Sequence, residues 1–64
     1  MERIKELREE KGLTQAQLGK ELMLNQNTIS DYENGKLEPS VQTIIKLCDI
    51  FDITADYLLG RKDF

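Results

Sequence analysis

The sequence predicts an all-α domain, and three observations lead to this prediction. Apolar residues recur at three- and four-residue spacing in five short stretches, which is the period of a helix that buries one face. Residues that cap helices precede most of these stretches. We expect no strands, and the chain has no repeats or low-complexity linker.

The first helix is expected over residues 2–11. Ile4 and Leu7 lie on its inward face, Gly12 ends it, and Leu13 follows as a further core residue.

The second helix is expected over residues 14–22. The Thr14 hydroxyl can accept from the Gln17 amide while the Gln17 side chain reaches back, which is a capping box. Leu18 and Leu22 are four residues apart, so they face the same way.

The third helix is expected over residues 26–33, with Asn25 as its cap and Gly35 after its end. At about 100° per residue, Ile29 and Tyr32 point to one side of this helix. The opposite side is polar: Asn27, Asp31 and Asn34 cluster there, Thr28 and Ser30 flank them, and Gln26 sits at the exposed first turn. A half-buried helix is implied.

Two more helices complete the domain. Pro39 and Ser40 start the fourth, over residues 41–50, which is expected to bury Val41, Ile44, Ile45 and Cys48. Phe51 and Ile53 bridge to the fifth, over residues 55–59, which Thr54 caps and Gly60 ends.

Length and composition bound the class of protein. The 64 residues, 1–64, form one domain near the lower limit for folding without disulfides or metal. Cys48 is alone, so no internal disulfide can form, and its apolar surroundings favour a buried thiol over a reactive one. The chain has no histidine, so we expect no zinc site, no metal and no cofactor. No apolar run approaches a membrane span and the charged start is unlike a secretion signal, so a cytoplasmic protein is expected.

The run from Thr14 to Lys36, TQAQLGKELMLNQNTISDYENGK, resembles the helix-turn-helix of the Cro/C1-type (xenobiotic-response-element) repressors. The resemblance extends from RIKELREEKGLTQ at the start to ADYLLG at the end. Its marks are the LTQ opening, the YENGK segment, and four inward residues: Leu18, Leu22, Leu24 and Ile29. It implies a compact five-helix fold of the lambda-repressor-like DNA-binding type, in which the second and third helices form the helix-turn-helix.

The sequence departs from the family pattern at two positions. Gly19 stands where alanine is usual, which permits close packing but weakens the helix by about 1 kcal/mol. Met23 stands where glycine is usual at the turn, so we expect either strain or a shifted turn.

The resemblance assigns roles to the polar residues of this run. Base contacts are expected from Gln26, Asn27, Thr28 and Asp31, because side-chain amides can pair with adenine, a threonine methyl can touch thymine and a carboxylate can accept from cytosine. Phosphate contacts are expected from Gln15, Asn34 and Lys36, together with the free amides at the start of the second helix. For all of these the alternative is a solvated polar face, and Asn34-Gly35 is also an ordinary turn signal.

Charge is the main argument against DNA binding, since the net charge is −3. The resemblance implies that Glu33 pairs with Arg8 in a partly buried ion pair, for which a surface salt bridge is the alternative. The proposed DNA face is nearly neutral, because Lys11, Lys20 and Lys36 are balanced by three acidic residues: Glu21, Asp31 and Glu33. Binding must depend on amides and helix termini more than on cations.

We therefore expect a transcriptional regulator, specifically a repressor that binds a pseudo-palindromic double-stranded DNA operator as a homodimer through the major groove. The leading candidate for the dimer interface is the last helix and tail, with Tyr57, Leu58, Leu59 and Phe64. The alternative is a protein-interaction module, such as an antitoxin-like helix-turn-helix domain that docks a partner protein. Catalysis is not expected, because no nucleophile stands beside a base, and no small-molecule ligand is evident.

Overall fold

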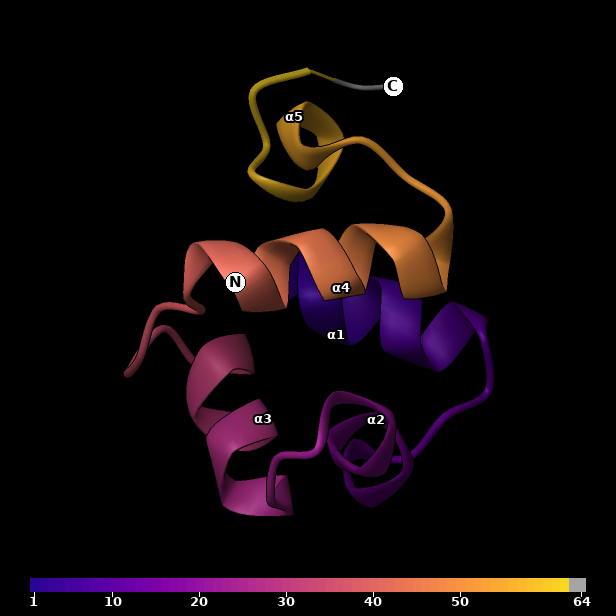
Figure 1. The fold of residues 1–64 in the computed structure, drawn as a ribbon, viewed down its shortest axis with the longest axis vertical. Coiled ribbons are helices and arrows are strands. Elements are labelled where there is room, and N and C mark those ends of the chain that lie inside the picture. Colours follow the sequence, from indigo (N-terminus) through magenta and orange to yellow (C-terminus); the bar gives the residue numbers. More distant parts are fainter. Residues whose placement is uncertain (63–64) are drawn as a thin grey trace.

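The computed structural model describes residues 1–62, and over this range the chain forms five helices and no strand (Figure 1). They are α1 (Glu2–Glu10), α2 (Gln15–Leu22), α3 (Gln26–Glu33), α4 (Val41–Phe51) and α5 (Ala55–Leu58). The predicted all-α fold is confirmed, and each helix end lies within one residue of its expected position. None of these helices is long and apolar enough to cross a membrane.

Side-chain caps set where four of the helices begin. In each case the capping oxygen accepts from the backbone amide three residues further on, which satisfies a donor that has no partner within the helix. The distances are 3.0 Å for Thr14, 2.9 Å for Asn25, 3.2 Å for Ser40 and 3.1 Å for Thr54. At Thr14 the reciprocal bond is also present, because its amide donates to Gln17 Oε1 at 2.7 Å.

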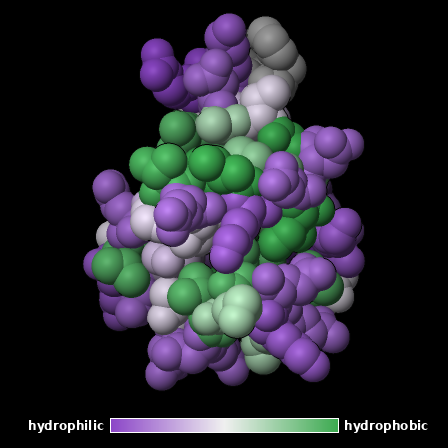
Figure 2. Space-filling model, viewed as in Figure 1, coloured by the Kyte–Doolittle hydropathy of each residue, from purple (hydrophilic) through white to green (hydrophobic). Residues whose placement is uncertain are grey.

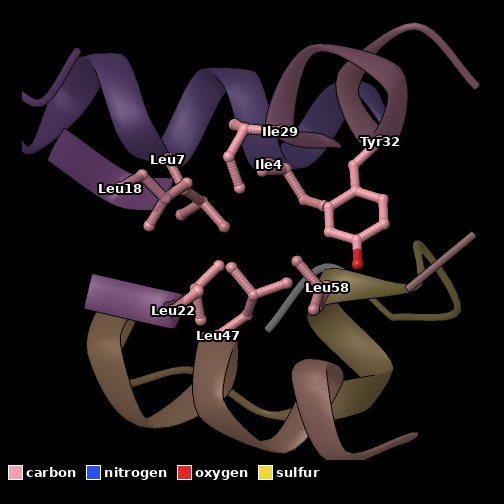
Figure 3. Packing of buried hydrophobic residues seen from close by; sticks show 8 residues of the cluster. All are labelled: Ile4, Leu7, Leu18, Leu22, Ile29, Tyr32, Leu47 and Leu58. Carbon is pink, nitrogen blue, oxygen red and sulfur yellow. The ribbon is translucent and has the colours of Figure 1, made fainter. Parts of the chain in front are cut away.

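One core joins all five helices, and Figure 3 shows the side chains from each helix converging on it. Five of the buried side chains are almost completely removed from water, and each contributes about 1.5–3 kcal/mol through its burial. The eight buried apolar residues are Ile4, Leu7, Leu18, Leu22, Ile29, Tyr32, Leu47 and Leu58.

Helix α4 buries only part of the face expected of it. Val41 and Ile45 were expected in the core but are 73% and 56% exposed, whereas Leu47 is fully buried. Ile44 and Cys48 are half-buried against the core. Ile45 lies about 160° around the helix from the buried Leu47 and so faces away from the core, and Val41 belongs to the first turn of the helix.

Helix α5 packs back on the molecule through Leu58, which is 2% exposed. The Tyr57 ring is half-buried, with the Arg3 guanidinium 4.4 Å from its centroid, and Arg3 Nη1 donates to the Tyr57 carbonyl at 3.1 Å. Only Leu59, at 45% exposure, remains an exposed apolar residue of the expected interface, and Phe64 lies outside the described residues. The last helix is therefore more a part of the core than a free surface.

Candidate nucleic-acid interface

Helices α2 and α3 are joined by a three-residue turn, Met23 to Asn25. Met23 adopts a left-handed backbone, with φ 60° and ψ 38°, and its amide donates to carbonyls of the last turn of α2. The turn has therefore not shifted. It accommodates methionine in a conformation that costs a residue with a Cβ on the order of 1 kcal/mol.

Gly19 allows the turn to fold back tightly on α2. The Leu24 amide donates to the Gly19 carbonyl at 2.7 Å, and a Cβ placed on Gly19 would lie 2.6 Å from the Leu24 carbonyl oxygen. That distance is shorter than van der Waals contact permits. A close approach was expected at this small residue, and the structure shows that the backbone of the turn makes it. The angle between α2 and α3 depends on this close contact.

Helix α3 has one buried side and one polar side. Ile29 is fully buried and Tyr32 is 5% exposed, while Gln26 and Asn27 at the opposite side of the first turn are exposed. The structure brings the four candidate base-reading residues onto this one helix, three in its first turn and Asp31 one turn later. A helix that is anchored through one face and exposes amides on the other can enter a groove without unpacking.

The Thr28 side chain is already engaged with the helix cap. Its hydroxyl donates to Asn25 Oδ1 at 3.1 Å, and the same oxygen accepts from the Thr28 amide at 2.9 Å. The methyl group is therefore the part of Thr28 left to meet a base, which restricts its candidate role to an apolar contact such as that with thymine.

A buried ion pair holds α3 to α1. Arg8 Nε lies 2.7 Å from Glu33 Oε2, and the two residues are 9% and 8% exposed. Arg8 Nη1 also donates to the Leu13 carbonyl at 2.7 Å. The hydrogen bond that Arg8 donates to Glu33 raises the pKa of the Arg8 guanidinium, so the guanidinium stays charged. The ion pair that the resemblance implied is present, and it is buried rather than superficial.

Gln15 extends this pair toward the polar side of α3. Its Nε2 donates to Glu33 Oε1 at 3.1 Å, and its Oε1 accepts from Gln26 Nε2 at 3.4 Å. The carboxylate accepts only, so it fixes which end of the Gln15 amide faces Gln26. Sequence reasoning missed this chain of contacts, because it joins residues of different helices and no spacing along the sequence signals it.

Candidate phosphate donors lie at the start of α2. The capping box occupies the amides of Thr14 and Gln17, which leaves the amides of Gln15 and Ala16 as the free donors of the first turn. One N–H of the Gln15 side chain is used by Glu33 and a second remains. The positive end of the helix dipole adds to these donors.

The loop after α3 contains the other two candidate phosphate contacts. Asn34 is the C-cap of α3, and its Nδ2 donates to Ser30 Oγ at 3.3 Å, so its structural role is present as well. Lys36 is exposed, and its backbone amide donates to the Asp31 carbonyl at 2.9 Å. The lysine side chain is thus placed by a hydrogen-bonded turn.

Burial changes the charge balance of this surface. Glu33 is removed from it by its pairing with Arg8, and Asp31 is only half-exposed. The lysines of the helix pair and its flanks remain exposed: Lys11, Lys20 and Lys36. Glu21 is also exposed, so three lysines face two acidic residues, and the surface is slightly positive although the chain is acidic.

Comparison with known proteins places the chain among regulators. Residues 4–58 match the helix-turn-helix family. The chain is 34% identical to the HTH-type transcriptional regulator ImmR of Bacillus subtilis, over 95% of the chain and 48% of that protein. It is 36% identical to the HTH-type transcriptional regulator AnsR of B. subtilis, over 97% of the chain and 53% of that protein. These proteins are regulators, not enzymes.

A third relative differs in the direction of control. The chain is 34% identical to the HTH-type transcriptional activator BcrR of Enterococcus faecalis, over 97% of the chain and 30% of that protein. The chain spans about half the length of the first two relatives and less of this one. No solved structure matches the chain.

Proposed function

The chain belongs to the Cro/C1-type helix-turn-helix family of transcription regulators, and we propose that it binds double-stranded DNA sequence-specifically and represses transcription. Helix α3 lies in the major groove in this proposal. Gln26, Asn27, Thr28 and Asp31 contact bases there, and Gln15, Asn34 and Lys36 contact phosphates.

The observation that supports the proposal most strongly is the division of α3 into two faces. Its buried face is held by Ile29, Tyr32 and the paired Glu33, so the helix cannot turn away from the direction it presents. Its exposed first turn carries two amide side chains, which can donate and accept at once, as pairing with an adenine edge requires.

The amide of Gln26 is oriented in this proposal by its neighbours. Donation from Gln26 Nε2 to Gln15 leaves the Gln26 carbonyl oxygen and one N–H for a base. The contacts through Gln15 and Glu33 to Arg8 would hold this side chain in place before DNA binds. Less of its conformational entropy would then be lost on binding.

The chain acts as a homodimer on a pseudo-palindromic operator in this proposal. One domain that makes a handful of uncharged contacts binds a half-site weakly, and two linked domains gain affinity from their effective concentration. The half-sites would lie about one helical turn apart. Repression is expected if the operator overlaps a promoter. Because one of the relatives is named an activator, activation is the alternative that an experiment must distinguish from repression.

Selection from a pool of random duplexes at two salt concentrations tests the proposal. The duplexes retained by the chain are sequenced, and a twofold-symmetric motif is expected at both concentrations. Absence of any enrichment at low salt, where attraction to phosphate is greatest, would contradict it. A promoter fusion that contains the recovered motif then distinguishes repression from activation by the sign of the change in transcript level.

A further inference from the structure

Helix α4 leaves an apolar surface without a partner. Five of its residues are exposed, and we call them the α4 face: Val41, Gln42, Ile45, Lys46 and Asp49. Val41 and Ile45 lie one turn apart, at 73% and 56% exposure, so their side chains are neighbours on the helix surface. Figure 2 shows apolar atoms gathered over α4 with hydrophilic ones between them.

We propose that the α4 face receives a second copy of this chain, related to the first by a twofold axis. This inference rests on the proposed function, because a dimer is what that function requires. It assigns the contact to α4, whereas the sequence pointed to the last helix and tail.

Charge favours a second copy as the occupant of this face. In a twofold contact the same patch meets itself, so a patch of one sign repels its copy. The α4 face has one cation, Lys46, and one anion, Asp49, so it is neutral and two copies of it do not repel each other. A strongly basic or acidic partner would meet no opposite net charge on the α4 face.

The other helices offer no comparable surface for a second copy. The outward side of α1 is acidic, with one lysine among its exposed charged residues: Glu2, Lys5, Glu6, Glu9 and Glu10. Two such helices would repel each other. The polar sides of α2 and α3 are taken by DNA in the proposed function. The large apolar residues of α5, Tyr57 and Leu58, are half-buried and buried, and Leu59, the residue after α5, is exposed beside them.

The size of the α4 face predicts a weak dimer. A stable protein interface buries about 800 Å² on each partner, and one face of a helix of 11 residues supplies less. We therefore expect the chain to be monomeric in dilute solution, to dimerise as its concentration approaches millimolar, and to bind two adjacent half-sites cooperatively.

The first test is sedimentation equilibrium of the chain alone, with Val41→Asp and Ile45→Asp as the variants. An aspartate at position 41 lies in the first turn of α4, where the helix dipole favours a negative charge, so we expect Val41→Asp to retain the fold. Each variant should dimerise at least tenfold more weakly than the unsubstituted chain. Leu59→Asp is the matched control: it places the same charge on an exposed leucine of the competing surface, and dimerisation should be unchanged.

Three results would overturn the inference. They are an unsubstituted chain that stays monomeric up to millimolar concentration, α4 variants that dimerise like the unsubstituted chain, and loss of dimerisation in Leu59→Asp alone. Circular dichroism of each variant confirms that the fold is retained, and if Ile45→Asp is unfolded, Val41→Asp decides.

The second test separates this inference from the proposed function. Duplexes with one or two copies of the selected half-site are titrated with the chain and with Val41→Asp. The variant should bind one half-site with unchanged affinity and lose cooperativity on two, by tenfold or more. Failure of the unsubstituted chain to bind any duplex would contradict the proposed function, while sedimentation would still decide whether the α4 face dimerises.

Discussion

Glu33 shows how one residue links stability to the candidate site. Its carboxylate neutralises Arg8 inside the protein and also fixes the Gln15 amide, which in turn contacts Gln26. A carboxylate that is buried and paired costs little, but either partner alone would be a buried charge without compensation. The same residue therefore keeps its negative charge off the candidate DNA-binding surface and anchors α3.

Removing this carboxylate should destabilise the fold strongly. Glu33→Ala leaves the Arg8 guanidinium buried and unpaired, so we expect the free energy of unfolding to fall by about 3–5 kcal/mol in urea denaturation. Glu21→Ala, which removes an exposed carboxylate from α2, is the control and should change it by less than about 0.5 kcal/mol. A loss below about 1 kcal/mol for Glu33→Ala would mean that the pair contributes no more than a surface salt bridge.

Individual residues also show what the sequence could predict. The caps at Thr14, Asn25, Ser40 and Thr54 were predictable, because each acts within three residues of itself. The Gln15 contacts were not, since they depend on how two helices approach each other in space. The candidate base-reading residues could be predicted from the sequence, because they all belong to one helix. The apolar face of α3 packs on the core, so the side chains on its opposite face point away from the core.

At the scale of the helices, the turn between α2 and α3 combines two unusual residues. Gly19 lacks the Cβ that would collide with the Leu24 carbonyl, and Met23 takes the left-handed backbone that a glycine would adopt more easily. In this chain the glycine therefore lies in α2 and the larger residue lies in the turn. The family pattern described above is the reverse, with alanine in the helix and glycine in the turn.

Alanine at position 19 should lower stability, although alanine is the better helix former by about 1 kcal/mol. In Gly19→Ala the new Cβ would lie 2.6 Å from a backbone oxygen, so the turn must shift, at a cost of about 1–3 kcal/mol. Thermal unfolding measures the net loss. Lys20→Ala, at the exposed neighbouring position, is the control and should leave stability nearly unchanged. A stabilised Gly19→Ala variant would show that the turn relaxes freely.

The two classes of contact proposed for the helix pair should respond differently to substitution. Asn27→Ala should cost about 1–3 kcal/mol of binding free energy on the preferred duplex and relax preference at one base position. Lys36→Ala should weaken binding to all sequences similarly, because the phosphate group is the same at every nucleotide. Binding of both variants to duplexes with single base-pair changes distinguishes them, and identical profiles would show that the sorting of contacts is wrong.

Helix α4 marks the limit of sequence reasoning at this scale. Its existence and its start at Ser40 were predictable, but the choice between its two apolar sides was not. With Val41 and Ile45 on one side and Leu47 on the other, burial is decided by where α2 and α5 lie. Periodicity along one helix does not contain that information.

At the scale of the whole molecule, the charge distribution distinguishes this chain from strongly basic DNA-binding proteins. The net charge is −3, and Lys36 is the only cation among the proposed phosphate contacts. Helix termini and amides release few counterions on binding, so affinity should depend only weakly on salt.

The salt dependence can be measured directly. With one to two phosphates neutralised per protomer, the slope of log K against log salt should be about −1 to −2 for a single half-site duplex, because each neutralised phosphate contributes about −0.9. Lys36→Ala should make this slope shallower by about 1. A slope of about −5 or steeper would mean that bulk electrostatic attraction, not amides and helix ends, anchors the protein to DNA.

We expect the exposed first turn of α3 to contact DNA bases, and ¹⁵N–¹H correlation spectra of the chain with a one-half-site duplex test this contact. The largest chemical-shift changes are predicted for the side-chain amides of Gln26 and Asn27 and for the backbone amides of Gln15, Ala16 and Lys36. A scrambled duplex should leave the two side-chain amides nearly unshifted. Changes confined to α4 or α5, with the first turn of α3 unaffected by the selected duplex, would contradict this expectation.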